Sequence, residues 1–219
     1  HNGGWAGSIN ENKTYQRNTQ PMKDKIYKKP DYKPPKELPI EAYDFLVDLR
    51  SIPEYVLTRN RVSFVKGAIT FPFIKNGEVV NIKSRTLDKK FWQEREAEKV
   101  FYGHDDIDND LTIITEGEID KLTLETAGFQ NSISVPDGAP SEGTKEYSNK
   151  FDFLDRYEGR LKEVKQFIIA VDNDSPGKLL EKELARRLVW GKCSRVVWPE
   201  GCKDANEVLI KHGSEAIKK

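Results

Sequence analysis

"TEGEID", residues 115–120, and "AVDNDSPG", residues 170–177, each gather carboxylates and small residues directly after an apolar run. Carboxylates repel one another, so a fold that brings them together usually needs a cation nearby. The preceding runs, LTIIT and QFIIAV, are apolar and rich in β-branched residues, as buried strands are. The sequence therefore predicts two buried strands that each end in an acidic loop.

The pattern around these stretches alternates short apolar runs with helical segments. Strands are expected at residues 111–115, 131–135, 166–171 and 194–199. Helices are expected at residues 118–128, within 141–159, at 176–191 and at 204–213. Continuous apolar strands that alternate with helices are typical of a parallel sheet covered on both faces. The predicted fold class is therefore α/β, with a mainly parallel sheet flanked by helices.

The chain before residue 109 follows a different pattern. Residues 1–38 are poor in apolar side chains and contain KKPDYKPPKELP, a stretch typical of a linker. Helical character begins near Pro39, and a second short helix is expected at residues 52–60. Two β-rich runs then flank Asn76-Gly77, the strongest short hairpin signal. We expect a small α+β subdomain over residues 39–108, ahead of an α/β domain over 109–219.

The predicted hairpin carries two further expectations. Pro72 has no N–H to donate, so its strand is expected at the edge of the sheet. On the second strand, side chains alternate between the two faces, so Asn81, Lys83 and Arg85 share one face.

The composition is that of a soluble, polar chain of 219 residues, of which 33% are charged and 37% hydrophobic. No apolar run approaches the roughly 18 residues that a membrane span needs. The start lacks an initiator Met and a signal-peptide pattern, so we expect a piece of a longer protein. Cys193 and Cys202 lack metal-type spacing and are interpreted as reduced thiols of an intracellular protein. Basic residues predominate over 59–99 and acidic residues over 101–158, which indicates an anionic partner beside a metal site, or ordinary solvated surfaces.

Four acidic positions follow the predicted strands. Glu116 follows the first strand, Asp172 and Asp174 follow the third, and Asp204 comes a short loop after the fourth. The carboxyl ends of parallel strands meet at one edge of a sheet, so these carboxylates are expected to meet there. Clustered carboxylates suit Mg²⁺, which also binds substrate phosphates. The implied chemistry is phosphoryl or nucleotidyl transfer.

These acids also have structural explanations. Asp120 lies in the first turn of a predicted helix, where the macrodipole favours negative charge. Asp174 or Ser175 is suited to cap the helix that follows. Asp204, with Glu207 three residues later, matches a helix N-cap pattern.

TEGEID followed by VDNDSPG resembles the motif pair of TOPRIM domains, which occur in DnaG-type primases, topoisomerases and some nucleases. Together with EGEIDKLTLETAGFQNSISVPDGAP and WPEGCKDANEVL, the pair strongly resembles the primase half of phage T7-type primase-helicases and their Twinkle-like relatives. The resemblance runs from about Ile69 to about His212, and KDANE makes it specific within TOPRIM proteins. It implies a TOPRIM core preceded by a small α+β subdomain, with a primer made in the cleft between them.

The resemblance also implies roles for particular residues. Glu116 would be a metal ligand or a general base. The catalytic set would be Glu116, Asp172 and Asp174, and these acids together with Asp204 would hold Mg²⁺ or Mn²⁺. The basic positions that would contact nucleotide phosphates or template are Lys83, Arg85 and Lys89, whose alternative is a solvated strand face. The auxiliary positions are Gly117, which would let the chain turn sharply behind Glu116, Asp120 and Lys203.

The first residues, HNGGWAG, resemble the end of the zinc ribbon that opens such primases. Gly3 stands where that ribbon carries a Cys, so zinc is not expected in this chain and His1 is not a credible ligand. The resemblance implies a hexameric helicase domain as a partner, fused or separate, and no P-loop is present in this chain. The expected location is intracellular, in a phage-infected bacterial cytoplasm or an organelle matrix, without a membrane partner.

The implied reaction is template-directed joining of ribonucleoside triphosphates into a short RNA primer on single-stranded DNA. A TOPRIM nuclease is an alternative that would use the same acids and metal with water as nucleophile. A second alternative is a non-catalytic module that binds single-stranded DNA beside a replicative helicase. The presence of Glu116, Asp172 and Asp174 favours catalysis, whereas the missing ribbon favours poor initiation.

Overall fold

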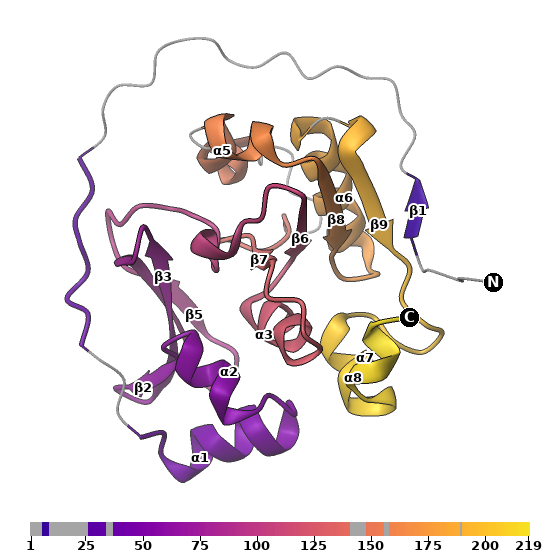
Figure 1. Ribbon diagram of the computed structural model, residues 1–219. Helices are drawn as coiled ribbons and strands as arrows, with labels where there is room; N and C mark the ends of the chain where they lie inside the picture. The colour runs from indigo at the N-terminus through magenta and orange to yellow at the C-terminus, as the bar shows by residue number, and fades with distance from the viewer. Residues whose placement is uncertain (1–5, 9–25, 34–36, 141–147, 156–157, 189) are drawn as a thin grey trace.

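The computed structural model describes residues 6–8, 26–33, 37–140, 148–155, 158–188 and 190–219. Two sheets lie side by side, and helices pack around both of them (Figure 1). The first sheet has four antiparallel strands, and the second has five strands and is mainly parallel. Within the described residues, no helix combines the length and the apolar character needed to cross a bilayer. The predicted fold class, a parallel α/β sheet preceded by a small α+β unit, is confirmed.

The antiparallel sheet has the order β2-β3-β4-β5. Its strands are β2 (Ser63–Val65), β3 (Ala68–Lys75), β4 (Glu78–Arg85) and β5 (Phe91–Gln93). Asn76 and Gly77 join β3 to β4 with φ of 54° and 79°, the positive values that a two-residue type I′ hairpin requires. The carboxylate of Asp105 accepts both of their N–H groups at 2.8 Å. The predicted hairpin is therefore confirmed, and a distant acid fixes its turn.

The edge position predicted from Pro72 is wrong. β3 lies inside the sheet, between β2 and β4. Pro72 pairs with Ile82 of β4, whereas β2 pairs with Ala68–Thr70 alone. The proline therefore lies beyond the end of β2, where its missing N–H interrupts no pairing with that strand.

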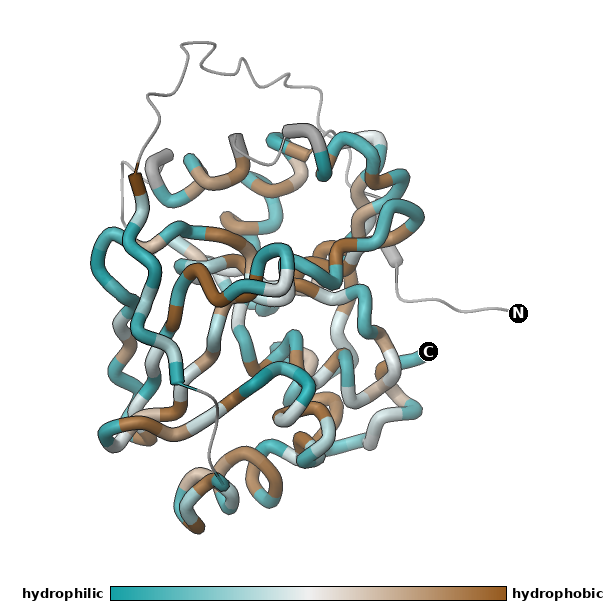
Figure 2. The backbone as a smooth tube through the Cα atoms, turned by 60° about the vertical axis from the view of Figure 1, so that its left-hand side comes forward, coloured by the Kyte–Doolittle hydropathy of each residue, from teal (hydrophilic) through white to brown (hydrophobic). Residues whose placement is uncertain are grey.

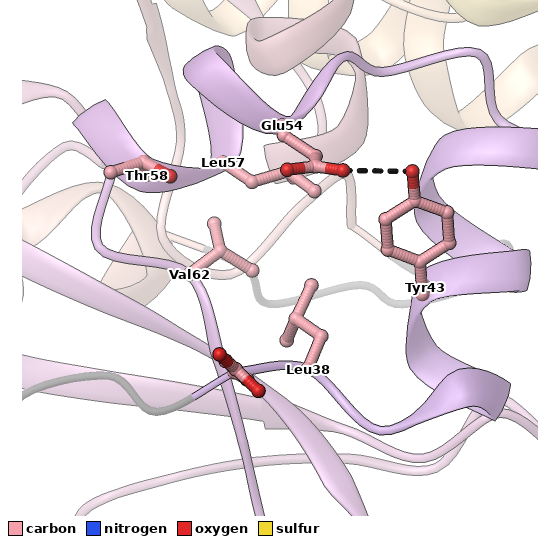
Figure 3. A pocket seen from close by; sticks show the side chains of 7 residues that line it. Leu38, Tyr43, Glu54, Leu57, Thr58 and Val62 are labelled. Carbon is pink, nitrogen blue, oxygen red and sulfur yellow. Dashed lines mark hydrogen bonds between the residues drawn. The ribbon is translucent and has the colours of Figure 1, made fainter.

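Three helical segments pack against this sheet: α1 (Ile40–Tyr43), the π-helical η1 (Asp44–Leu49) and α2 (Glu54–Arg59). Leu46 of η1 and Val56 of α2 are buried, as is Ile52 in the connection between them. A cavity of about 500 Å³ opens between α1 and α2, where the Tyr43 hydroxyl donates to Glu54 at 2.8 Å (Figure 3).

The second sheet has the order β1-β9-β8-β6-β7. Its strands are β1 (Ala6–Ser8), β6 (Leu111–Thr115), β7 (Ser132–Ser134), β8 (Gln166–Ala170) and β9 (Cys193–Val196). The last four are parallel, as predicted, and β6 lies between β7 and β8. β1 adds an antiparallel edge strand on β9, and it overlaps HNGGWAG, the stretch that resembles the end of a zinc ribbon. Three residues carry too little periodic signal for such a strand to be recognised.

Helices cover both faces of the parallel sheet (Figure 1). They are α3 (Glu118–Thr126), α4 (Asp152–Asp155), α5 (Glu158–Glu163), α6 (Ser175–Leu188), α7 (Ala205–His212) and α8 (Ser214–Ile217). Short 3₁₀ turns occur at η2 (His104–Asp106), η3 (Ser148–Phe151) and η4 (Trp190–Lys192). Ile113 of β6 packs in one cluster with Leu124 of α3 and Val208 of α7, whereas Ile114 packs in the other with Leu184 of α6. The two-sided burial of β6 explains its continuous apolar sequence.

The larger apolar cluster extends across both sheets. It includes Val56 and Phe71 of the first unit and Ile114 and Phe167 of the second. Hydrophobic segments accordingly run through the interior of both sheets, while hydrophilic segments predominate in the loops (Figure 2). Tyr102 adds a backbone bridge to Ser134 of β7. The two units therefore share one core.

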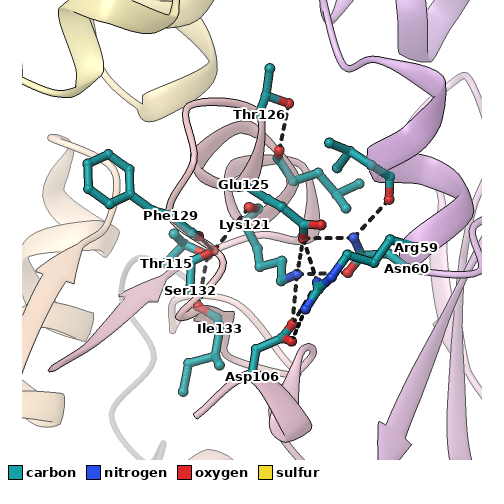
Figure 4. Close-up of polar contacts among 12 residues, drawn as sticks. Arg59, Asn60, Asp106, Thr115, Lys121, Glu125, Thr126, Phe129, Ser132 and Ile133 are labelled. Carbon is teal, nitrogen blue, oxygen red and sulfur yellow. Dashed lines mark hydrogen bonds and ion pairs between the residues drawn. The ribbon is translucent and has the colours of Figure 1, made fainter. Parts of the chain in front are cut away.

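A buried polar network also joins the units (Figure 4). Lys121 of α3 is fully buried and forms ion pairs with Glu125 at 2.5 Å and with Asp106 at 3.0 Å. Its ammonium also donates to Asn60 at 2.7 Å. Arg59, at the end of α2, pairs with both carboxylates. The network fixes α2 against α3, the helix that begins beside Glu116.

Candidate active site

The acidic site lies where β6 and β8 end side by side. Thr115 and Ala170, the last residues of these strands, are paired in register. Glu116 follows directly, and Asp172 comes two residues after Ala170. The chain leaves β6 for β7 on one side, and β8 lies on the other side. Such a switch point is where open α/β sheets bind ligands.

Glu116 is held in a largely buried position. Its Oε1 accepts the N–H of Ala139 at 3.3 Å, and its Oε2 is buried without a hydrogen-bond partner among the described residues. Burial, and then the nearby Asp172, raise the pKa of Glu116 to about 7. Glu116 therefore gains or loses its proton near neutral pH, and a nearby cation would keep it ionised.

Asp172 and Asp204 share the ammonium of Lys203. Its Nζ lies 3.2 Å from Asp172 and 3.4 Å from Asp204. Burial raises the pKa of Asp172, Lys203 lowers it, and the neighbouring aspartates raise it again. Burial would lower the pKa of Lys203, but Asp172 and Asp204 raise it well above its usual value. The structure thus brings these predicted residues together. Asp204 is also the N-cap of α7, with Oδ1 accepting the Glu207 N–H at 2.8 Å.

Asp174 lies at the start of α6, where its Oδ1 accepts the N–H of Gly177 at 2.9 Å. The capping role that the sequence suggested is therefore present. Gly177 has its own reason to be glycine, because a Cβ there would lie 2.0 Å from the carbonyl oxygen of Asp172. The first turn of α6 consequently packs directly on the loop that presents Asp172.

The reason predicted for Gly117 is wrong, although its position is as expected. Its φ of −125° and ψ of 160° are extended values that any residue adopts. A Cβ at Gly117 would instead lie 3.3 Å from a carboxylate oxygen of Asp120. Burial, and then Asp204 and Asp172, raise the pKa of Asp120 well above its usual value. Gly117 therefore leaves room for Asp120, which belongs to the same group of acids.

Two of the three predicted basic residues line one face of β4. Lys83 forms an ion pair with Glu118, at the start of α3, at 2.8 Å. Arg85 is 5% exposed, and its guanidinium lies over the rings of Phe45 at 4.5 Å and Phe91 at 5.6 Å. One of its nitrogens, Nη1, is buried without a hydrogen-bond partner among the described residues. An unmatched guanidinium nitrogen is suited to an anion.

Lys89 is not on that face. It lies exposed in the turn between β4 and β5, with a φ of 65°, and its N–H donates to the Thr86 carbonyl at 3.1 Å. The structure therefore does not bring Lys89 together with Lys83 and Arg85.

The loop after β7 holds residues that sequence reasoning missed. Asp137 accepts from Gln93 of β5 at 3.0 Å and pairs with Lys99 at 2.6 Å. Lys150 donates to the carbonyl of Ala139 at 2.9 Å, which fixes the segment whose N–H contacts Glu116. In the sequence, VPDGAP indicates only a turn, so its contacts with Gln93, Lys99 and Lys150 could not be predicted.

The donor set fits a divalent cation in its chemistry. The acids carry oxygen ligands, and one Glu116 oxygen lacks a hydrogen-bond partner among the described residues. Burial, and then repulsion between the acids, raise the pKa values of Glu116, Asp120 and Asp172. Within the described residues, however, no three His, Cys, Asp or Glu side chains are arranged to hold a metal ion. Mg²⁺ usually takes one or two protein carboxylates and completes its shell with water and substrate phosphates.

Comparison with known proteins identifies the domain. Residues 113–209 match the Toprim-like family model. The chain is 42% identical over 185 residues to the Twinkle homolog protein, chloroplastic/mitochondrial, of Arabidopsis thaliana, covering 77% of this chain and 26% of that protein. It is 42% identical over 194 residues to the Primase homolog protein of the same plant, covering 81% and 57%. The chain thus spans less than two thirds of either relative.

Solved primase structures share the fold. The primase fragment of the bacteriophage T7 primase-helicase matches with a TM-score of 0.62 and 24% identity, over 78% of this chain and 70% of that one. The RNA polymerase domain of Mycobacterium tuberculosis primase DnaG matches with a TM-score of 0.61 and 17% identity, over 81% and 74%. With the acids at the ends of β6 and β8, these similarities show that the chain contains a TOPRIM primase domain of the T7 and Twinkle type.

Proposed function

We propose that this chain is the catalytic core of a DNA-directed RNA primase. It joins ribonucleoside triphosphates into a short primer on a single-stranded DNA template, with Mg²⁺ or Mn²⁺ at the acidic site. The observation that carries the proposal is the meeting of Glu116, Asp172, Asp204 and Asp120 where β6 and β8 end. The similarity to a plant primase homolog and to primase structures supports the same reaction class.

In this proposal the acids bind the metal and manage the proton. A divalent cation, when bound, lowers the pKa of the attacking 3′-hydroxyl and neutralises charge on the phosphate under attack. Asp172 and Asp174 are the proposed metal ligands, and Asp204 supports them. Glu116 is a ligand or the proton acceptor, and its pKa of about 7 suits the second role near neutral pH.

The basic face of β4 is the proposed binding surface for nucleotide and template. Arg85 has a buried nitrogen without a hydrogen-bond partner among the described residues, beside two aromatic rings, and this nitrogen is proposed to reach a phosphate when a nucleotide binds and the side chain moves outward. Lys83 reaches α3 through Glu118, so it couples that face to the acidic loop. Lys89, which is exposed in the β4–β5 turn, is proposed to contact the template backbone from outside the face.

The proposed organisation extends to the whole protein. Residues 39–108 form the α+β subdomain, residues 109–219 form the TOPRIM domain, and residues 1–38 contain the end of a ribbon and a linker. The ribbon resemblance depends on HNGGWAG, of which residues 1–5 lie outside the described residues and Ala6 and Gly7 belong to β1. The partners are single-stranded DNA, ribonucleoside triphosphates and a hexameric helicase domain, fused or separate. An organelle matrix or a phage-infected bacterial cytoplasm is the proposed location.

The test is incorporation of labelled ribonucleotides on single-stranded templates of mixed sequence. A dinucleotide is supplied so that extension does not depend on initiation. Asp172→Asn is compared with wild type and with the control Asp110→Asn. Asp110 is exposed and lies just before the first residue of β6, at the end of the strand opposite the acidic site. We expect Mg²⁺-dependent short RNA from wild type and Asp110→Asn, and none from Asp172→Asn. Equal RNA from all three would refute the assignment.

The same gel separates the two alternatives. Metal-dependent shortening of the template, without RNA, would identify a nuclease that uses the same acids. Neither product, together with tight and salt-sensitive template binding, would identify a non-catalytic module attached to a helicase.

A further inference from the structure

Lys203 places a positive charge inside the acidic site. Its ammonium lies between the carboxylates of Asp172 and Asp204, at 3.2 Å and 3.4 Å. Those carboxylates are largely buried, with 16% and 12% of the side chain exposed. The Lys203 side chain is 54% exposed, so a path to solvent remains open to it.

The backbone of Lys203 is fixed on both sides, so the position of the ammonium is built into the fold. Its N–H donates to the carboxylate of Glu207 at 3.2 Å. Its carbonyl accepts the N–H of Asn173 at 2.8 Å, which ties the loop before α7 to the loop after β8. The side chain therefore begins beside Asp172 whichever rotamer it adopts.

The site concentrates negative charge that this one ammonium offsets only in part. Burial, and then the charge of Asp204, raise the pKa values of both Asp120 and Asp172, so the three carboxylates lie close to one another. A divalent cation that binds Asp172 or Asp204 approaches the oxygens that the ammonium already contacts. Two positive charges a few ångströms apart repel, so occupancy by one disfavours occupancy by the other.

We propose that Lys203 is a built-in counter-charge, which holds Asp172 and Asp204 together without metal and competes with a divalent cation for them. This inference rests on the proposed metal site. Because the carboxylates are already gathered, metal binding requires little rearrangement of the loops. Because the ammonium must be moved away from them, metal binding is weaker than the acids alone would make it. Lys203 is a positioning residue, and its charge lets a bound metal ion be released more easily.

The proposal predicts opposite effects of one substitution on two properties. Lys203→Gln keeps a polar side chain of similar length and removes the charge. We expect its affinity for Mn²⁺ to rise by about threefold to tenfold, since a unit charge is removed a few ångströms from the ion. In EDTA we expect its thermal unfolding midpoint to fall, because Asp172 and Asp204 lose their counter-charge. Lys203→Arg should behave as wild type in both measurements.

The experiment titrates Mn²⁺ into the whole chain and follows free ion by electron paramagnetic resonance, with thermal unfolding in EDTA measured in parallel. Lys218→Gln is the control, because Lys218 is 46% exposed and pairs with Glu215 at 2.6 Å, in α8. Asp172→Asn identifies the binding that belongs to the site.

The outcomes separate the inference from the function on which it rests. Tighter Mn²⁺ binding by Lys203→Gln, with Lys218→Gln unchanged, supports the proposal. If Asp172→Asn abolishes Mn²⁺ binding but Lys203→Gln does not tighten it, the competition is overturned and the metal site stands. If wild type and Lys203→Gln bind no Mn²⁺, both the metal site and the competition are refuted. An unfolding midpoint of Lys203→Gln in EDTA equal to that of wild type refutes the role as counter-charge.

Discussion

Replacing the buried Lys121 by Met tests the polar network that joins the two sheets. Met retains the length and the apolar stem of Lys and removes the charge. Lys121 is fully buried, and its partners Glu125 and Asp106 are 1% and 15% exposed. Removing one partner of a buried ion pair costs about 3–5 kcal/mol, because the remaining charge is left uncompensated. Arg59 still contacts both carboxylates, so we expect the lower end, about 3 kcal/mol.

For a chain of this length, that loss corresponds to a fall in unfolding midpoint of about 6–12 °C. The assay is unfolding followed by circular dichroism, in urea for the free energy and by heating for the midpoint. Lys165→Met is the matched control, since Lys165 and Asp110 form an exposed pair, and it should leave the midpoint unchanged. In the Lys121→Met background, Glu125→Gln should restore part of the stability, because it removes one of the uncompensated charges. Lys121→Met within 0.5 kcal/mol of wild type would refute the reasoning.

Three further predictions concern the acidic site. Gly177→Ala should lower the free energy of unfolding by more than about 2 kcal/mol, because its Cβ would overlap the Asp172 carbonyl. Gly191→Ala is the control, since a Cβ there meets open space, and equal urea midpoints for the two variants would contradict the prediction. Glu116 has a folded pKa of about 7 against 4.5, so its contribution to stability is full below about pH 4.5 and is lost as the pH rises through 7. In EDTA, the thermal unfolding midpoint of Glu116→Gln should therefore fall less than that of wild type between pH 5 and pH 8. Equal falls in the two midpoints would contradict this prediction. Asp204→Ala should lower the free energy of unfolding by about 1 kcal/mol, because α7 loses its N-cap. Asp204→Ser should keep the cap and still weaken Mn²⁺ binding. Equal stability of the two variants would exclude the capping role.

The parallel sheet could be predicted because its inner strands β6 and β8, and β7 beside them, are largely buried. Burial of that kind leaves an unbroken apolar run in the sequence, as at residues 111–115 and 166–170. Glu116 and Asp172 follow those runs, so their meeting was a consequence of topology. Asp204 could be predicted both as an acid of the site and as a cap, and the structure has it as a cap beside Asp172.

The remaining features depend on partners far away in the sequence. Lys83 looked like a free cation on a strand face, and it pairs with Glu118, 35 residues later. The need for glycine at position 117 comes from the Asp120 carboxylate rather than from its own backbone angles. Pro72 was assigned to an edge because the sequence does not reveal how far β2 extends. Such pairings become visible only when the chain is folded.

The shared apolar cluster has a consequence for how the protein comes apart. A cut at the proposed boundary after residue 108 would pass through the interior, because Phe71 packs edge-to-face on Tyr102, whose backbone pairs with Ser134 beyond the cut. Neither half would retain a closed interior of its own. The two halves are therefore one cooperative folding unit although they contribute different surfaces to the site. We expect amide hydrogens in β3 and β6 to exchange through the same global opening, so that the two sheets separate only when the whole molecule unfolds.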